Sequence, residues 1–373
     1  MAKLFLYYFV RAFKMKPWQL ALTTASLFSS LAQCSSTHHF DRFFPGWNTY
    51  LQDIIHNNCS KQFESYRTDR IQPPNSPSSL ITPLIECILN NFPEFRKTEL
   101  GASAVILGLL PTILQSLGSR TAESAVLARR RPFLAVLLAG GSPAVNIARG
   151  SEFVETLEKY VEGREAEDTI PGVRMGLLSP YLRPWISILE YLLVGCAVAN
   201  IAHLTYRLGV NAVVGFAPQT TYLLPLWAFL AVVIHLGGSL VLHLRVTVRP
   251  GNESKYRTGR RVDGFPSWVL EEFIPCAFQS PKFLRWRPKE TLWFPVLSWL
   301  LNLGILVHVV FGTLVMSSLL FFSVVDSVMI ITRFVGSAII CRTVVRVELA
   351  GIAESMRYQG LNERPEDEVE LTP

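Results

Sequence analysis

The amino-acid sequence predicts an all-α fold, a polytopic helical transmembrane protein with four full spans and a short fifth one. Three observations lead to this prediction. Half of the 373 residues are hydrophobic and only 17% are charged, whereas soluble domains carry about 25% charged residues. The apolar residues are gathered into runs that match the ~30 Å hydrocarbon core of a bilayer. Basic residues flank these runs, as orientation signals do.

Residues 1–33 are typical of a signal peptide or another targeting segment. Lys14 and Lys16 precede an apolar stretch that ends in small residues, and this pattern predicts cleavage near Ala32. Three alternatives stay open at this end of the chain. The segment could be an uncleaved anchor, translation could start at Met15, or the first residues could form an interfacial helix.

Residues 34–100 are predicted to form a lumenal or extracellular region. Asn58 begins an N-x-S sequon and is the expected glycosylation acceptor. An oxidising compartment permits disulfides, and a bridge between Cys59 and Cys87 is expected, with Cys34 left over. The alternative is that all three cysteines stay reduced.

Residues 101–346 are predicted to be the transmembrane helical region. A crossing helix needs about 20 mostly apolar residues, and four runs meet this condition. Tryptophan and tyrosine residues lie near several of their ends, as interfacial anchors do. The four runs are Leu100–Leu117, Trp185–Tyr206, Tyr222–Leu244 and Trp293–Phe322.

Two further apolar segments are less clear. The segment 328–345 contains Arg333, which would cost about 2.5–3.5 kcal/mol in the middle of a bilayer and less near its edge. Asp326 could pair with that arginine, so we expect a short fifth crossing, with an interfacial amphipathic helix as the alternative. The segment 132–145 is too short to cross and contains Gly141 and a proline, which favours a re-entrant or interfacial piece.

The basic residues set the predicted orientation. The loop 119–181 holds eight Lys and Arg residues and the loop 247–291 holds nine, whereas the loop 209–221 holds none. The positive-inside rule places both basic loops in the cytosol. Residues 34–100 then lie outside the cytosol and the C-terminus inside it, in a membrane of the secretory pathway or the plasma membrane. The acidic tail 347–373 is predicted to be disordered.

Charge also bears on the expected partners. The net charge is +6 and the isoelectric point about 9.0, but the basic residues flank apolar runs, so nucleic acid is not expected. The expected partner is the lipid bilayer, with a homo-oligomer possible and the ligand unknown. Aromatic and basic residues of 265–290 suit either a helix on an anionic leaflet or an ordinary orientation flank. A second sequon at Asn252 falls in the cytosolic loop and is expected to stay bare.

Four polar residues inside the spans form a candidate intramembrane polar site: His235, His308, His203 and Glu190. His235 and His308 lie near the middle of their spans and could meet at the midplane. One interpretation is a proton relay or a metal pair; the other is neutral imidazoles that hydrogen-bond between helices. A metal would need a third ligand, and Glu190 lies too far away in depth. We therefore predict no catalytic residue, metal or cofactor.

Four stretches carry a resemblance to other proteins. They are Asn58-Cys59-Ser60, Leu107-Gly108-Leu109-Leu110-Pro111-Thr112-Ile113-Leu114, Arg131-Pro132-Phe133-Leu134 running to Gly141-Ser142-Pro143, and Glu348-Leu349-Ala350-Gly351. With them the chain resembles a group of uncharacterised multi-pass integral membrane proteins of filamentous ascomycete fungi. The resemblance runs from Cys59 to Gly351 and implies a fungal membrane protein of several spans, with no catalytic residue.

The sequence leaves three classes of function open. The first is a non-enzymatic scaffold or surface sensor, which requires nothing beyond the spans. The second is a small transporter or channel that uses His235 and His308, with the Gly237-Gly238 pair as a hinge; five spans are few for transport, so it would need an oligomer. The third is an intramembrane enzyme, for which neither a nucleophile nor a metal-binding set is evident in the sequence.

Overall fold

The structure is a computed structural model, and most of the residues that it describes are helical. The structure describes residues 39–68, 78–146, 183–250, 271–279, 282–287 and 293–362. Within these residues the strands form two short antiparallel pairs. The predicted all-α, polytopic fold class is therefore confirmed. The predicted signal segment 1–33 lies outside the described residues.

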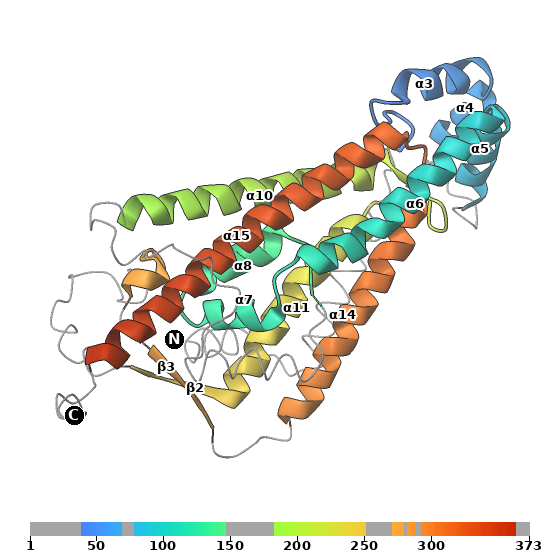
Figure 1. The fold of residues 1–373 in the computed structure, drawn as a ribbon. Coiled ribbons are helices and arrows are strands. Elements are labelled where there is room, and N and C mark those ends of the chain that lie inside the picture. Colours follow the sequence, from blue (N-terminus) through green and yellow to red (C-terminus); the bar gives the residue numbers. More distant parts are fainter. Residues whose placement is uncertain are drawn as a thin grey trace. The chain divides into compact units, whose positions relative to one another are not determined.

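Five helices among the described residues are long and apolar enough to cross a membrane (Figure 1). They are α6 (Glu94–Leu117), α10 (Arg183–Asn211), α11 (Leu223–Arg245), α14 (Trp293–Ser317) and α15 (Val324–Asn362). The first four lie where the four full spans are predicted.

Large apolar side chains stay exposed along these helices. Leu189 and Leu192 on α10, and Leu306 and Val310 on α14, are each more than half exposed. Apolar surface of this extent would be unfavourable in water. Lipid tails solvate it well, which is consistent with helices that lie in a bilayer.

The end of α14 differs from the predicted fourth span, which runs on to Phe322. The helix stops at Ser317, and strand β4 (Leu319–Leu320) pairs antiparallel with β1 (Val213–Val214). Phe321 then has a φ of 66°, a left-handed conformation that is rare for a bulky residue. The turn lies at the polar residue Ser318, directly after Ser317, but two serines within a long apolar run did not end the predicted span.

The last helix corrects two predictions. The predicted fifth crossing is short, but α15 is a 39-residue helix whose part Val324–Glu354 suits a span. The helix also continues through residues 347–362, where the sequence predicts a disordered tail. Leu349 and Ile352 are buried in the core there, and this packing holds the helical conformation. The rest of the tail, 363–373, lies outside the described residues.

The chain folds into two compact units, and each long helix contributes to both. Unit 1 comprises Met1–Leu109, Leu204–Leu226 and Thr313–Ile330, and unit 2 comprises Leu110–His203, Trp227–Gly312 and Ile331–Pro373.

Unit 1 contains the three short helices α3 (Asn48–Asn57), α4 (Ser60–Thr68) and α5 (Ser78–Asn90). They enclose a core rich in aromatic rings. Its buried members include Phe40, Phe43, Trp47, Leu51, Ile55, Tyr66, Leu84, Ile88, Phe92 and Phe321. The predicted outer region therefore packs around a hydrophobic core that Phe321, from beyond residues 34–100, completes.

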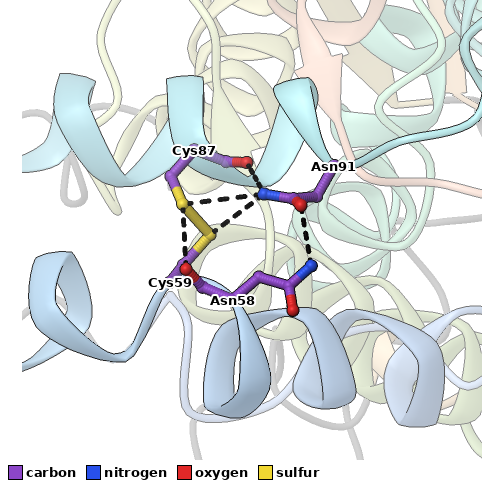
Figure 2. The surroundings of a disulfide bond; sticks show 4 residues. All are labelled: Asn58, Cys59, Cys87 and Asn91. Atoms are coloured by element: carbon purple, nitrogen blue, oxygen red, sulfur yellow. Dashed lines mark hydrogen bonds between the residues drawn. A yellow bond between two sulfur atoms is a disulfide. The ribbon is translucent and has the colours of Figure 1, made fainter.

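A disulfide joins Cys59, just before α4, to Cys87 on α5, as predicted (Figure 2). The neighbouring Asn58 is exposed, and its Nδ2 donates to Asn91 Oδ1 at 2.7 Å. Asn91 Nδ2 in turn donates to the carbonyl oxygen of Cys87 at 2.8 Å. The predicted glycosylation acceptor thus lies on the surface beside the bridge.

Asp326 lies in the first turn of α15, where it bonds to Ser323 and Gly46 and not to Arg333, which corrects that prediction. The backbone N–H of Asp326 donates to Ser323 Oγ at 3.0 Å, and the Ser323 hydroxyl donates to Asp326 Oδ2 at 2.8 Å. The backbone N–H of Gly46 donates to both carboxylate oxygens at 3.1 Å. Ser323 Oγ thus accepts from an otherwise unpaired N–H of the first helical turn, and the Asp326 carboxylate is favourable there because it lies at the positive end of the helix dipole.

Unit 2 contains two short helices between α6 and α10, namely α7 (Thr121–Ala128) and α8 (Pro132–Gly141). Both pack with α10, α11 and α15 in one apolar core. A Cβ on Gly141 would lie 2.8 Å from Cys341 Sγ and 3.2 Å from Ala197 Cβ. The residues 142–145 that follow are non-helical and buried. Of the two predicted alternatives, this burial favours a re-entrant piece over an interfacial one.

The structure describes parts of the predicted basic loop 247–291. Strands β2 (Val246–Pro250) and β3 (Lys282–Trp286) pair antiparallel, and η4 (Cys276–Phe278) is a short 3-10 helix. The second sequon at Asn252 lies outside the described residues.

Candidate functional site

Arg131 is the centre of a buried polar cluster in unit 2. It stands between α7 and α8, and Pro132 at the first position of α8 lacks an N–H and fixes the backbone for the helix start. The Arg131 side chain has 0% exposure. A buried guanidinium needs acceptors for its N–H groups, and α10, α15 and the segment 271–279 supply them.

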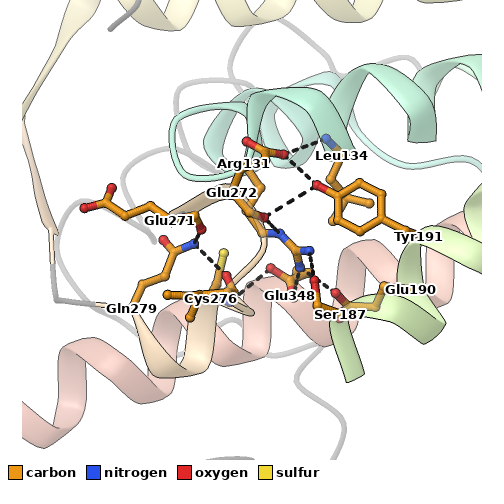
Figure 3. Close-up of polar contacts among 11 residues, drawn as sticks. Arg131, Leu134, Ser187, Glu190, Tyr191, Glu271, Glu272, Cys276, Gln279 and Glu348 are labelled. Carbon is orange, nitrogen blue, oxygen red and sulfur yellow. Dashed lines mark hydrogen bonds and ion pairs between the residues drawn. The ribbon is translucent and has the colours of Figure 1, made fainter. Parts of the chain in front are cut away.

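Every nitrogen of this guanidinium donates to a protein group (Figure 3). Nη1 donates to Glu190 Oε2 at 2.5 Å and to Glu348 Oε1 at 2.8 Å. Nη2 donates to Ser187 Oγ at 2.9 Å, and Nε donates to the carbonyl oxygen of Glu272 at 2.9 Å. Arg131 therefore ties α8 to α10, α15 and the segment 271–279.

Glu272 also links the segment 271–279 to α8 and α10. Its Oε1 accepts from the backbone N–H of Leu134, in the first turn of α8, at 2.9 Å and from the Tyr191 hydroxyl at 2.8 Å. Those bonds favour the carboxylate form, but burial outweighs them and raises the pKa of Glu272. The Tyr191 ring also lies under the Arg131 guanidinium, 5.3 Å from its centroid.

The cluster contains more buried carboxylates than Arg131 can neutralise. Glu190 and Glu348 share its Nη1, and no described residue donates a hydrogen bond to the buried Glu190 Oε1. Burial by itself would lower the pKa of Arg131, but the two carboxylates outweigh it and raise that pKa. Burial raises the pKa of the Cys276 thiol well above its usual value, so this thiol stays protonated and is a poor nucleophile. The arrangement can hold charge and take up a proton.

His235 and His308 both bind the non-helical segment 142–145. His308 Nε2 donates to the carbonyl oxygen of Pro143 at 3.1 Å, and His235 Nε2 donates to that of Ala144 at 3.4 Å. His235 Nδ1 lies 2.8 Å from the Ser124 hydroxyl. Non-helical backbone inside a bilayer needs such donors. This geometry favours the interpretation of neutral imidazoles that hydrogen-bond between elements.

His203 belongs to a third group, with Arg333. Arg333 Nε and Nη2 donate to Asn200 Oδ1 at 2.9 and 2.6 Å, and Nη2 lies 3.3 Å from His203 Nδ1. Asn200 Nδ2 donates to Ser337 Oγ at 2.8 Å. These contacts join α10 to α15, which lie side by side (Figure 1).

The four residues of the predicted polar site therefore belong to three separate groups. His235 and His308 share one segment, as expected, whereas His203 and Glu190 have other partners. Within the described part of the chain, no three His, Cys, Asp or Glu side chains come together as a metal site would require. Sequence reasoning missed the roles of Arg131, Glu272 and Glu348. Arg131 and Glu348 stand in the stretches that carry the resemblance, which was the available signal.

Comparison of the chain with models of protein families, with curated proteins and with solved structures finds no match. The resemblance to fungal membrane proteins therefore stays a prediction.

Proposed function

We propose that the chain is a non-enzymatic integral membrane protein that acts as a scaffold or a sensor. The observation that carries the proposal is the bonding of Arg131, whose three nitrogens all donate to groups of the protein itself. A charge that is fully used in joining helices supports a static role. The two midplane histidines support the same role, because each binds a backbone carbonyl oxygen.

Ion and proton flux through proteoliposomes tests this proposal. If the protein is a scaffold, liposomes that contain it should show no more ion or proton flux than empty liposomes. The double variant His235→Ala/His308→Ala should show the same flux as the wild type. His56→Ala, which changes an exposed histidine of α3, is the matched control. Flux above background that falls in the double variant but not in the control would refute the scaffold and support transport.

Transport is the second candidate, and one observation favours it. His308 Nδ1 is buried and has no hydrogen-bond partner in the described part of the chain. It lies next to a non-helical segment of the kind that lines sites in transporters. A working transporter of five spans would need a homo-oligomer. The same flux measurement therefore decides between the two candidates.

We further propose that the N-terminal region lies outside the cytosol, after cleavage of a signal peptide near Ala32, and that the C-terminus is cytosolic. The exposed amide of Asn58 beside the disulfide supports this orientation, as does the alternation of basic loops. Endoglycosidase treatment should lower the apparent mass of the protein made in eukaryotic cells, and Asn58→Gln should abolish the shift. Asn252→Gln should leave it unchanged; a shift lost only in that variant would reverse the orientation.

A further inference from the structure

Three arginines meet where α11 passes into β2. Arg129 Nη2 donates to the carbonyl oxygen of Val246 at 3.0 Å, and its Nη1 donates to His243 Nδ1 at 2.8 Å. The backbone N–H of Arg287 donates to the carbonyl oxygen of Arg245 at 3.0 Å, and Arg245 Nη1 donates to that of Arg287 at 3.2 Å. The pairing of β2 with β3 thus brings Arg287 to Arg245, which directly precedes Val246, one of the two residues that Arg129 binds.

Two of these arginines have no acidic partner among the described residues. Arg129 bonds only to neutral acceptors, and the Arg287 guanidinium has no acceptor within the described part of the chain. The Nε atoms of both are buried, and no group of the described residues accepts from them. Burial lowers the pKa of Arg129, and the positive charge of Arg287 lowers it further, so the two guanidinium groups repel each other.

The C-terminus of α11 compensates only part of this charge. A helix end carries about half a negative charge, and two of the carbonyl oxygens there already accept the bonds named above. Two guanidinium groups therefore keep an excess of positive charge and unused donors. Arginine presents these donors in a planar fork that matches phosphate oxygens.

We propose that Arg129 and Arg287 bind a phosphate group at this end of α11. The site lies where the candidate span Leu223–Arg245 ends. The first residues of α14 lie beside it: the Arg245 guanidinium is 5.7 Å from the centroid of the Phe294 ring, and Trp293 is 66% exposed. Exposed aromatic residues at the end of a span mark the headgroup level of a bilayer. The phosphate of an anionic lipid and a free phosphate are the two sources of the ligand.

Thermal unfolding of the full-length protein in neutral detergent tests the site. Short-chain phosphatidylglycerol, short-chain phosphatidylcholine and inorganic phosphate are titrated separately. We expect phosphatidylglycerol to raise the unfolding temperature of the wild type, with at least about tenfold weaker apparent affinity in Arg287→Gln. Lys61→Gln, which removes an exposed charge on α4, should respond as the wild type does. If inorganic phosphate stabilises the protein as much as phosphatidylglycerol does, the ligand is free phosphate. If inorganic phosphate does not stabilise it, the ligand is the lipid.

The same variant gives a second readout that a structural role would not produce. Without any phosphate compound, Arg287→Gln should unfold at the wild-type temperature or above it, because it loses repulsion and no hydrogen bond of the side chain. Stabilisation of the wild type and Arg287→Gln at the same concentrations would overturn the proposal. A marked loss of stability in Arg287→Gln without phosphate would also overturn it, as would the lack of any response in the wild type.

Discussion

Arg131 illustrates how a buried charge specifies an arrangement of helices. Removing a guanidinium from water costs several kcal/mol, and ion pairs often only offset that cost. The net stabilisation by its contacts with Glu190 and Glu348 is therefore small. Removing only one member of the cluster is strongly destabilising, because the remaining charges stay buried without a partner.

Arg131→Met should accordingly lower the free energy of unfolding by about 3–5 kcal/mol. The methionine fills much of the same volume, but Glu190 and Glu348 lose their shared donor. Thermal unfolding in detergent measures the effect, with Arg67→Met on the exposed face of α4 as the control. A loss in Arg131→Met no larger than in the control would contradict the account.

Adding Glu190→Gln to Arg131→Met should recover part of the lost stability, because the double variant buries one negative charge fewer. The recovery is measured in the same unfolding experiment. If the two losses simply added, the two residues would not be coupled, and the shared ion pair would have no energetic role.

The carboxyl of Glu272 predicts how stability changes with pH. Burial raises its pKa in the folded protein above the ordinary value of about 4.3. The folded state then binds the proton more tightly than the unfolded state, so the contribution of Glu272 to stability is full at low pH and is lost as the pH rises through the folded pKa. Glu272→Gln keeps the acceptor for Leu134 and should reduce this loss between pH 4 and pH 8. Parallel pH profiles of variant and wild type would refute the prediction.

Sequence reasoning could flag single polar residues but not their partners. Glu190 stands out because a carboxylate is rare inside an apolar run. Its partner Arg131 is 59 residues away, in a run of three arginines that reads as an orientation signal, and Glu348 lies 217 residues from Arg131. The positions of His235 and His308 along their spans sufficed to predict that the two lie at a similar depth. Their partners, the carbonyl oxygens of Pro143 and Ala144, could not be predicted, because they depend on how α8 packs among the long helices.

At the scale of elements, the short helix α8 depends on close packing at its end. Ten residues span about 15 Å, half of the hydrocarbon core, so the chain must stop inside the bundle. Gly141 makes this possible because its missing side chain leaves room for Cys341 and Ala197.

Gly141→Ala should destabilise the protein by about 1–3 kcal/mol, because the new methyl group would overlap the Cys341 sulfur. Gly195→Ala in α10 is the matched control, since no atom of the described residues outside its own helix lies within 4 Å of the added Cβ. That variant should be neutral or more stable by up to about 1 kcal/mol, from helix propensity. Thermal unfolding in detergent separates the two, and equal effects would show that α8 does not pack against α10 and α15 as described.

The sequence predicted that the long helices exist more accurately than it predicted the residues at which they end. Four spans follow directly from apolar length, which is a local property of the chain. The stop of α14 at Ser317 depends on the pairing of Leu319 and Leu320 with Val213 and Val214. The extension of α15 to Asn362 depends on packing by Leu349 and Ile352. Neither contact is local in sequence, so hydropathy could not indicate it.

At the scale of the whole molecule, unit 1 owes part of its stability to one covalent bond. The Cys59–Cys87 bridge closes a loop with a sequence separation of 28, and a bridge of this kind contributes about 2–4 kcal/mol. Cys59→Ser/Cys87→Ser should make the region around α3, α4 and α5 open to proteases at lower temperature, while the membrane helices stay protected. Limited proteolysis with mass spectrometry measures this, and the same cleavage pattern at the same temperature would contradict it.

The membrane fold as a whole was predictable because lipid imposes a strict length on apolar helices. The packing of those helices was not, because their buried and lipid-facing sides are equally apolar and amphipathic periodicity is weak. On α10, for example, Leu192 is exposed and Val194 is buried, and composition does not distinguish them.

Alkaline carbonate extraction of membranes from expressing cells tests the central claim most directly. Carbonate releases peripheral and lumenal proteins, whereas helices that cross the bilayer keep a protein in the pellet. Five helices of the length and composition found here predict that the chain stays in the pellet after the wash and enters the supernatant only with detergent. Recovery of the folded chain in the supernatant without detergent would contradict the account.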